Sequence, residues 1–408
     1  MEFLPPSNYS EEKTFFMKPT RIPIYVSLFL LPLLYRCRAL SDGSIPTPTM
    51  GSTGRVARAA IAQLCSTRNK HSNLRNVAIC AAWAKREKAS MLFLPECLGF
   101  MGDSAEHTLE QADRALSSKD LEPCLDSLHM TSFRRSLATV IESYAKRPDF
   151  EISNEAVALN NDDDLEQISI IDELRFIARE SGLWISGGGV HTQALSTAFN
   201  SVDDGRESKI HNTHIIIDSN GQIKNWYHKI HLFDVCIPGK INLRESKTTA
   251  PGTKLVVCDS PVGRLGVTIC YDMRFSEMYL DLVQKGGAEV LLVPSAFTVP
   301  TGKAHWHALL RARAIENQCY VLAAAQVGKH NEKRESYGHS LAYDPWGEIL
   351  CDAGGSDGVG TTDGIANGIG AGLPVPSIVL CDIDLDKVAE VRERMPIQQH
   401  RSISTFSF

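Results

Sequence analysis

Residues 264–282, RLGVTICYDMRFSEMYLDL, predict a buried strand that turns sharply and continues as a helix. The apolar run ends at Cys270, and the polar residues Tyr271, Asp272 and Arg274 follow within one turn. Burying polar groups costs free energy unless they have a partner or a function. A thiol at this strand end lies on a rigid frame, and the backbone N–H groups after it point toward whatever the sulfur attacks. Cys270 is therefore a candidate nucleophile, the alternative being one more buried thiol.

Strands and helices alternate along most of the chain, which predicts an α/β fold with sheets covered by helices. Two stretches interrupt this pattern: residues 117–166 are polar and predict a surface insertion, and residues 354–372 are rich in glycine and predict a flexible loop. We expect strands over 56–65, 90–95, 183–190, 213–218, 223–227, 254–259, 264–269, 289–294, 320–326 and 377–383, and helices over 74–88, 168–181, 278–285 and 305–318.

The composition narrows the classes of function. The 408 residues are 43% hydrophobic, enough for a large core, and the formal net charge of -6 gives no basic footprint for nucleic acid. The 11 cysteines form no CxxC pair and lie mostly in apolar runs, so we expect free thiols in a reducing compartment. We therefore expect no nucleic-acid partner and no zinc ribbon.

Residues 1–54 form an N-terminal extension of different character. Within it, residues 22–35 (IPIYVSLFLLPLLY) are apolar and follow Lys18 and Arg21. This run is shorter than the ~18 residues that span a bilayer, so we expect no stable membrane span. Its length suits the apolar region of a targeting peptide, which would place the protein in an organelle or the secretory route. The two other interpretations are a true start at Met50 and a disordered extension.

Two further charged residues follow strands that the pattern predicts to be buried. In FLPE, Glu96 ends an apolar strand, where desolvation would raise its pKa toward the range of a general base. In NWYHKIHLFD, Lys229 has aromatic and apolar neighbours and can stabilise a thiolate and the oxyanion formed by its attack. The structural alternatives are a loop or helix-capping carboxylate for Glu96 and a solvated strand-end charge for Lys229.

His228 and His231 flank this lysine and open two other interpretations, a metal pair and a Cys/His protease dyad. No carboxylate or third histidine stands nearby at the spacing of metal ligands. No Asn or Asp that would orient a catalytic imidazole stands out in the sequence. We therefore favour neither interpretation.

The combination of these segments resembles the nitrilase superfamily and, within it, the Nit-type amidases. FLPE, YHKIHLFD and ICYDMRF occur in the order Glu, Lys, Cys that this superfamily uses, and 41 residues separate the lysine from the cysteine (270 − 229). The resemblance covers roughly residues 56–353 and 377–385, except for the insertion. Three longer segments are similar to the Nit group: LRESKTTAPG (243–252), VPSAFTVPTGKAHWHALLRARAIENQCYVLAAAQVGKH (293–330) and ESYGHSLAYDPWG (335–347).

The resemblance implies a fold and a role for each residue of the site. The family fold is a four-layer α-β-β-α sandwich, so we expect residues 55–400 to form one carbon–nitrogen hydrolase domain. Glu96 is then the general base, Lys229 stabilises the tetrahedral intermediate, and Cys270 forms a thioester with the acyl part of the substrate. The family uses no cofactor and no metal, and its members commonly pair into homodimers through outer helices.

The resemblance also brings forward residues around these three. Glu245 in LRESK supports the site by positioning groups around it, and the N–H of Tyr271 joins the lysine at the oxyanion. Arg274, Ser295 and Thr301 are candidate substrate contacts, because an anionic small molecule requires cationic or hydroxyl groups in its pocket.

These substrate contacts have structural alternatives. Arg274 can pair with a neighbouring carboxylate such as Asp272, and Ser295 can cap the segment after its strand. The sequence departs from the family at Cys236, where a carboxylate is expected, and in the insertion at 117–166. Both departures bear on the identity of the substrate and not on the type of reaction.

The sequence thus predicts an amidase, a hydrolase of carbon–nitrogen bonds other than peptide bonds. It would release ammonia from a small-molecule amide, with deaminated glutathione as the expected substrate. An ω-amidase or nitrilase acting on a related small substrate is the alternative enzyme, and a non-catalytic scaffold of the same fold is the alternative of another class. The resemblance implies the cytoplasm, in contrast to the leader-based interpretation.

Overall fold

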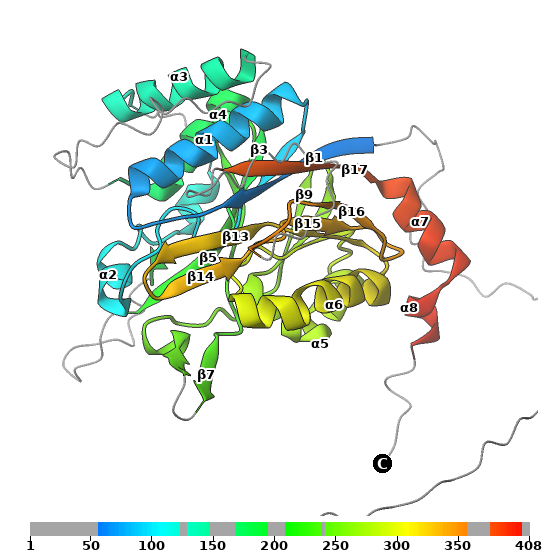
Figure 1. The fold of residues 1–408 in the computed structure, drawn as a ribbon. Helices are drawn as coiled ribbons and strands as arrows, with labels where there is room; N and C mark the ends of the chain where they lie inside the picture. The colour runs from blue at the N-terminus through cyan, green and yellow to red at the C-terminus, as the bar shows by residue number, and fades with distance from the viewer. Residues whose placement is uncertain are drawn as a thin grey trace, which may run out of the picture. The chain divides into compact units, whose positions relative to one another are not determined.

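The computed structural model describes residues 56–122, 129–146, 168–194, 209–237, 241–356 and 376–401. The extension at 1–54, parts of the insertion at 117–166 and most of the loop at 354–372 lie outside these residues. Within the described chain, two stacked sheets lie between two layers of helices (Figure 1). The predicted α/β class and the four-layer α-β-β-α sandwich are thereby confirmed.

The larger sheet has nine strands. They are β1 (Val56–Leu64), β2 (Met91–Phe93), β3 (Trp184–Ser186), β4 (Val190–Gln193), β5 (Ile210–Ile217), β6 (Ile223–His228), β13 (Ala325–Asn331), β14 (Arg334–Tyr337) and β17 (Ser377–Asp384). Their order is β14-β13-β1-β2-β3-β5-β4, with β17 paired to β1 and β6 paired to β5. The short parallel strands β2 and β3 lie in the middle, so the residues after β2 emerge near the centre of the sheet edge.

The smaller sheet has six strands in the order β16-β15-β12-β11-β10-β9. It consists of β9 (Val256–Ser260), β10 (Gly263–Val267), β11 (Val290–Leu292), β12 (Tyr320–Ala323), β15 (Leu341–Tyr343) and β16 (Ile349–Asp352). A separate hairpin is formed by β7 (Asp234–Ile237) and β8 (Ile241–Arg244), in which Cys236 pairs with Asn242.

Helices cover the outer face of each sheet (Figure 1). On the larger sheet lie α1 (Lys70–Arg86), α3 (Ser132–Lys146) and α4 (Ile170–Ser181), and on the smaller sheet lie α5 (Ser276–Gln284) and α6 (Val299–Asn317). Short helices α2 (Ala105–Glu110), α7 (Leu385–Arg394) and α8 (Ile397–His400) complete the described chain. The start of α1 is fixed by Asn69, whose side chain accepts a hydrogen bond from the Ser72 N–H at 2.9 Å.

The core has two parts, one on each face of the larger sheet. Along β1, Ala60, Ala62 and Leu64 face the cluster under α1 and α4, while Ala59 and Ile61 face the cluster between the sheets. A strand covered on both faces reads as a continuous apolar run rather than an alternating one. This explains why the buried strands were recognisable from the sequence as apolar segments.

Two of the predicted strands differ in the structure. The segment 320–326 is two strands, β12 in the smaller sheet and β13 in the larger, with Ala324 between them. The segment 183–190 ends its first strand at Ser186 and resumes at Val190 after three glycines. Because each run is buried on both sides, its apolar pattern does not reveal where the chain changes sheet or breaks.

Part of the predicted insertion at 117–166 is the amphipathic helix α3. Its apolar side chains Leu137, Val140 and Ile141 are buried where α3 packs on the outer side of α1 and α4 (Figure 1). The described part of this segment therefore adds to the outer helical layer of the larger sheet.

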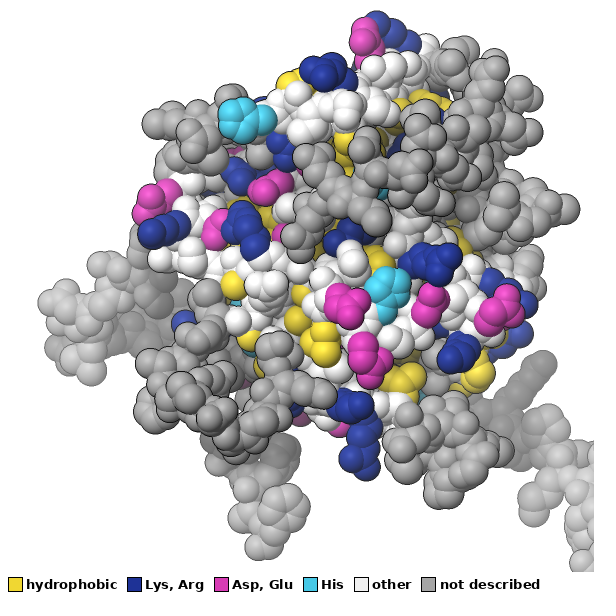
Figure 2. All heavy atoms as spheres, turned by 90° about the vertical axis from the view of Figure 1, so that its left-hand side faces the viewer, with side chains coloured by type: hydrophobic (Ala, Val, Ile, Leu, Met, Phe, Trp, Pro, Cys, Tyr) yellow, Lys and Arg dark blue, Asp and Glu magenta, His cyan; other side chains and the backbone are white. Residues whose placement is uncertain are grey.

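The described surface carries charges of both signs. On the face drawn in Figure 2, basic and acidic side chains lie interspersed rather than gathered into separate patches. Among the described helices, none combines the length and apolar character that crossing a bilayer requires.

Candidate active site

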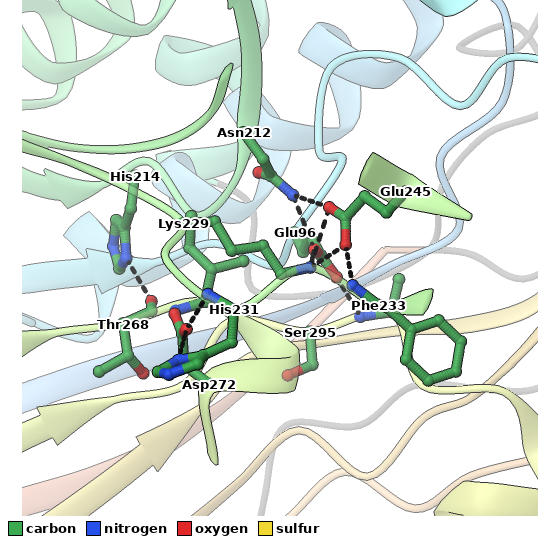
Figure 3. A network of polar contacts seen from close by, with 12 residues as sticks. Glu96, Asn212, His214, Lys229, His231, Phe233, Glu245, Thr268, Asp272 and Ser295 are labelled. Atoms are coloured by element: carbon green, nitrogen blue, oxygen red, sulfur yellow. Dashed lines mark hydrogen bonds and ion pairs between the residues drawn. The ribbon is translucent and has the colours of Figure 1, made fainter. Parts of the chain in front are cut away.

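The structure brings Glu96, Lys229 and Cys270 together where strands of the two sheets end. Glu96 follows β2, Lys229 follows β6 and Cys270 follows β10. The Lys229 ammonium lies 3.0 Å from Glu96 Oε1 (Figure 3), and the Cys270 thiol lies close enough to the same carboxylate for their charges to interact. Three residues separated by up to 174 positions (270 − 96) thus form one cluster of acid, ammonium and thiol.

Glu96 is held by donors from three different segments. Its Oε1 accepts hydrogen bonds from Lys229 Nζ at 3.0 Å and from Asn212 Nδ2 at 2.9 Å, and its Oε2 accepts one from the Ala296 N–H at 3.1 Å. The carboxyl group is buried at 5% exposure for the residue. A buried carboxylate with this number of donors has a fixed orientation, as a general base requires.

Lys229 lies between two carboxylates. Its ammonium contacts Glu96 on one side and both oxygens of Glu245 on the other, at 3.1 and 3.0 Å. Glu245 is held in turn by the Phe233 N–H, which donates to its Oε2 at 2.7 Å (Figure 3). The predicted supporting glutamate therefore lies against the lysine and fixes where its charge sits.

The pKa of Glu96 differs from the expectation. Burial acts to raise it, as the sequence suggested, but the Lys229 ammonium and the hydrogen bonds from Lys229, Cys270 and Asn212 outweigh burial. The pKa of Glu96 lies below its ordinary value, so the predicted rise toward neutrality is wrong. The sequence shows the apolar strand before Glu96 but not the cation that folding places beside it.

The other two groups are shifted in the opposite direction. Burial acts to lower the pKa of Lys229, but the carboxylates of Glu245 and Glu96 outweigh it and hold this pKa well above its ordinary value. Burial and the neighbouring Glu96 charge raise the pKa of the Cys270 thiol well above its ordinary value, against the effect of Lys229. The resting cluster is therefore a carboxylate, an ammonium and a protonated thiol.

Cys270 has an unusual backbone conformation. Its φ of +48° is in the left-handed region, which costs a non-glycine residue roughly 1–3 kcal/mol. The Cys270 N–H donates to the Pro294 carbonyl at 2.9 Å, and a short 3₁₀ turn runs from Cys270 to Arg274. The strand–turn–helix of the sequence is thus a tight turn that presents the sulfur to the cluster.

Glycines after β3 allow the sheet to approach Glu96. The Cys97 N–H donates to the Gly189 carbonyl at 2.8 Å, which ties the two segments together. A Cβ at Gly189 would lie 2.6 Å from Asn212 Oδ1 and 3.0 Å from Glu96 Cγ. The backbone at Gly189, the last of three glycines, therefore packs directly against the Glu96 and Asn212 side chains, where no Cβ would fit.

The three candidate substrate contacts have different surroundings. The Arg274 guanidinium lies over the rings of Tyr271 and Phe297, 5.7 and 5.6 Å from their centroids, and its Nη2 is 3.3 Å from His305 Nδ1. The Ser295 hydroxyl is fully buried and donates to the Val293 carbonyl at 3.1 Å. The segment after β11 contacts Glu96 through the backbone N–H of Ala296 and not through the Ser295 hydroxyl.

Thr301 lies in the first turn of α6. Its hydroxyl contacts Thr298 Oγ1 at 2.8 Å and donates to the Thr298 carbonyl at 3.1 Å, as the hydroxyl of a helix start commonly does. Of the three, Arg274 has the least occupied polar group, since its Nε is buried without a hydrogen-bond partner in the described chain.

The histidines beside Lys229 are engaged elsewhere. His228 Nδ1 contacts Thr213 Oγ1 at 2.9 Å, its ring stacks on His211, and burial lowers its pKa to about 4. His231 donates to the buried carboxylate of Asp272 at 2.8 Å. Their contacts give no support to the metal pair or the Cys/His dyad.

Asn212 and Asp272 were not predicted as residues of the site. Asn212 lies in IHNTHIII, where a buried polar residue inside an apolar strand was a usable signal. Asp272 was considered only as a partner for Arg274, whereas it accepts hydrogen bonds from Tyr227 and His231. Neither partner lies near it in sequence, so only the folded chain reveals the pairing.

Comparison with known proteins gives one consistent family. The family model "Carbon-nitrogen hydrolase" matches residues 58–198 and 165–393. The chain is 37% identical over 355 residues to the deaminated glutathione amidase of Dictyostelium discoideum, covering 86% of this chain and 96% of that protein. It is 38% identical to the bovine (Bos taurus) protein of the same name, covering 84% and 81%. Among solved structures, the C. elegans NitFhit protein matches with a TM-score of 0.62 and 34% identity over 87% of this chain and 67% of that one.

Proposed function

The chain belongs to the carbon–nitrogen hydrolase family, and from this premise we propose that Glu96, Lys229 and Cys270 hydrolyse the amide bond of deaminated glutathione. As a member of this family the chain is an amidase that acts on carbon–nitrogen bonds. The observation that carries the residue assignment is the contact of one buried carboxylate with both the ammonium and the thiol. We place the catalytic domain at residues 55–400.

The first half-reaction forms a thioester. Glu96, kept ionised by Lys229, takes the proton of the Cys270 thiol as the sulfur attacks the amide carbonyl carbon. The oxyanion is stabilised by the Lys229 ammonium and the N–H of Tyr271, at roughly 3–4 kcal/mol per donor. The C–N bond then breaks, and Glu96 returns the proton to the nitrogen, which leaves as an amine. The amides of deaminated glutathione are secondary, so this amine is its cysteinylglycine part.

The second half-reaction releases the acid. Glu96 takes a proton from water, whose oxygen attacks the thioester carbonyl, and the same two donors stabilise the second oxyanion. The C–S bond breaks and the thiolate recovers the proton from Glu96. A base with a lowered pKa suits this cycle. It gives its proton to the leaving nitrogen in the first half-reaction and to the thiolate in the second, and each time it becomes ionised again.

Arg274 is the residue we propose to bind a substrate carboxylate. It starts from a turn shared with Cys270, its guanidinium is held by two aromatic rings, and its Nε is buried without a partner in the described chain. Deaminated glutathione carries carboxylates beyond the amide, which a cation at this position would select. ω-Amidase or nitrilase activity on a related small substrate would meet the same groups.

Two substitutions test the assignment. We expect Lys229→Ala to abolish the release of cysteinylglycine from deaminated glutathione, because it removes the oxyanion donor and the cation that keeps Glu96 ionised. Cys270→Ala should also be inactive yet still bind the substrate, as measured by calorimetry. Arg311→Ala, on the exposed side of α6 with its Nε bonded to the Gly347 carbonyl, is the control that should remain active.

Mass spectrometry of the wild-type protein quenched during turnover should find the acyl group on Cys270. Hydrolysis of deaminated glutathione by either the Lys229 or the Cys270 variant would contradict the mechanism. A wild-type protein that binds the amide without hydrolysing it would instead favour the non-catalytic scaffold. A panel of amides and nitriles separates the three enzyme alternatives, with cysteinylglycine measured for deaminated glutathione and ammonia for primary amides and nitriles.

We also propose that the chain pairs into a homodimer and binds no nucleic acid. Apolar side chains are exposed on α6 and on the neighbouring β15–β16 hairpin, with Ile315 at 43%, Trp346 at 54% and Ile349 at 43%. Clustered exposed apolar groups commonly mark a protein interface. Light scattering should give twice the chain mass, and Ile315→Glu with Trp346→Glu should reduce it to that of one chain.

A further inference from the structure

Asp272 is a fully buried carboxylate two residues after the nucleophile. Its Oδ2 accepts hydrogen bonds from the Ile269 N–H at 3.0 Å and the Tyr227 hydroxyl at 2.7 Å. Its Oδ1 accepts two from His231, from the backbone N–H at 3.0 Å and from the ring Nδ1 at 2.8 Å (Figure 3). A side chain with this many donors in the core has a single fixed position.

These donors belong to two catalytic segments. Ile269 directly precedes Cys270, whereas Tyr227 and His231 stand two residues before and two residues after Lys229. The Tyr227 hydroxyl additionally accepts a hydrogen bond from the Ile230 N–H at 3.0 Å. One carboxylate therefore binds both the turn that carries the sulfur and the loop that carries the ammonium.

The contacts also hold a strained turn. Asp272 N–H donates to the Ile269 carbonyl at 3.1 Å while the Asp272 side chain accepts from the Ile269 N–H, so the turn is closed from both sides. This closure encloses Cys270, whose φ is positive. Strained residues of this kind persist only where their surroundings determine them more than once.

From these contacts we propose that Asp272 is a positioning residue, which sets the distance between the Lys229 ammonium and the Cys270 sulfur through Tyr227, His231 and Ile269. The proposal rests on the proposed function for its kinetic consequence. Asp272 lies behind the turn and acts through the residues that it holds. A misplacement of about 1 Å between reacting groups lowers turnover on the order of 100-fold.

Asp272→Asn is the sharpest test because it keeps the shape of the side chain. Whichever way the amide lies, its NH₂ group faces a backbone N–H, of Ile269 or of His231, and at least one hydrogen bond is lost. We expect kcat to fall on the order of 100-fold with KM changed less than about threefold. Tyr227→Phe removes the bond to Asp272 together with the acceptor of the Ile230 N–H, and it should lower kcat about tenfold.

The matched control is Tyr279→Phe. Tyr279 is also a fully buried tyrosine of this core, and its hydroxyl bonds to Thr268 Oγ1 at 2.7 Å rather than to Asp272. It should lose thermal stability as Tyr227→Phe does while its kcat stays within about threefold of wild type. Adding Tyr227→Phe to Asp272→Asn should lower kcat by less than the product of the two single effects, because both changes weaken the same link between the two segments.

A second measurement separates this proposal from the proposed function. The rate of Cys270 alkylation by iodoacetamide, followed by mass spectrometry, needs no turnover, and we expect it to change in Asp272→Asn and Tyr227→Phe but not in Tyr279→Phe. If the wild type does not hydrolyse deaminated glutathione but this alkylation pattern holds, the proposed function fails and the positioning role stands. If Asp272→Asn fails to fold, the two tyrosine variants decide. Equal kcat and equal alkylation in Tyr227→Phe and Tyr279→Phe would overturn the positioning role.

Discussion

At the level of single residues, the charge state of the site depends on two opposing effects on the pKa of Glu96, burial and the neighbouring ammonium. Burial acts to raise the pKa of this carboxyl, but the Lys229 ammonium and the neighbouring hydrogen-bond donors lower it. The same ammonium lies between Glu96 and Glu245, so its own pKa is raised. In the mechanism that we propose, proton transfer from the buried thiol therefore starts from a base that is already ionised.

The pH dependence of turnover follows from this charge state. Glu96 acts as a base only when deprotonated, so activity is lost as the pH falls through its pKa in the folded protein. Because that pKa is below the ordinary 4.5, we expect kcat/KM to stay constant from pH 7 down to about 5. Stopped assays of cysteinylglycine release from deaminated glutathione between pH 4 and 8 measure this profile.

Asn212→Leu is the companion variant for this measurement. It removes one donor from Glu96, so the acid limb should move to higher pH. A wild-type limb centred above pH 6 would contradict the low pKa, and an unmoved limb in the variant would remove Asn212 from its causes.

At the scale of elements, the break between β3 and β4 brings the chain against Glu96. Gly189→Ala would place a Cβ 2.6 Å from Asn212 Oδ1 and 3.0 Å from Glu96 Cγ, so it should displace both side chains. We expect a loss of kcat on the order of 100-fold, measured by the release of cysteinylglycine from deaminated glutathione.

Gly182→Ala is the control for this effect. Gly182 ends α4 with a φ of +71°, and an added Cβ there meets no atom within 4 Å. The substitution should cost about 1 kcal/mol of folding free energy from backbone strain and leave kcat unchanged. A Gly189→Ala protein as active as Gly182→Ala would show that the close approach is not required.

At the scale of the whole molecule, α3 is joined to the helical layer by a buried ion pair. Arg134 Nη2 lies 2.8 Å from Glu173 Oε1 on α4, and both side chains are at most 10% exposed. Arg134→Ala would leave the Glu173 charge buried, at a cost of about 3–5 kcal/mol in the free energy of unfolding. Urea denaturation measures this loss.

The double variant Arg134→Met with Glu173→Leu should recover much of that stability, since apolar side chains of similar volume replace the pair. Both variants should retain kcat, because the catalytic cluster lies at the strand ends of the two sheets and not in this outer layer. A single variant as stable as wild type would mean that water or another group solvates Glu173.

The alternation of strands and helices, the α/β class and the family could be predicted from the sequence. Glu96 and Cys270 stood out because each follows an apolar run, a local pattern that needs no knowledge of the fold. Lys229 stood out by its aromatic and apolar neighbours and by its place in YHKIHLFD.

The interactions between these residues could be seen only in the folded chain. The low pKa of Glu96, the partnership of Asp272 with Tyr227 and the change of sheet at Ala324 all arise from contacts between segments far apart in the chain. The reason is the distance along the chain between the groups. The burial of a group can be predicted from the residues beside it, but folding brings the cation, the hydrogen-bond donor or the second sheet into contact with it.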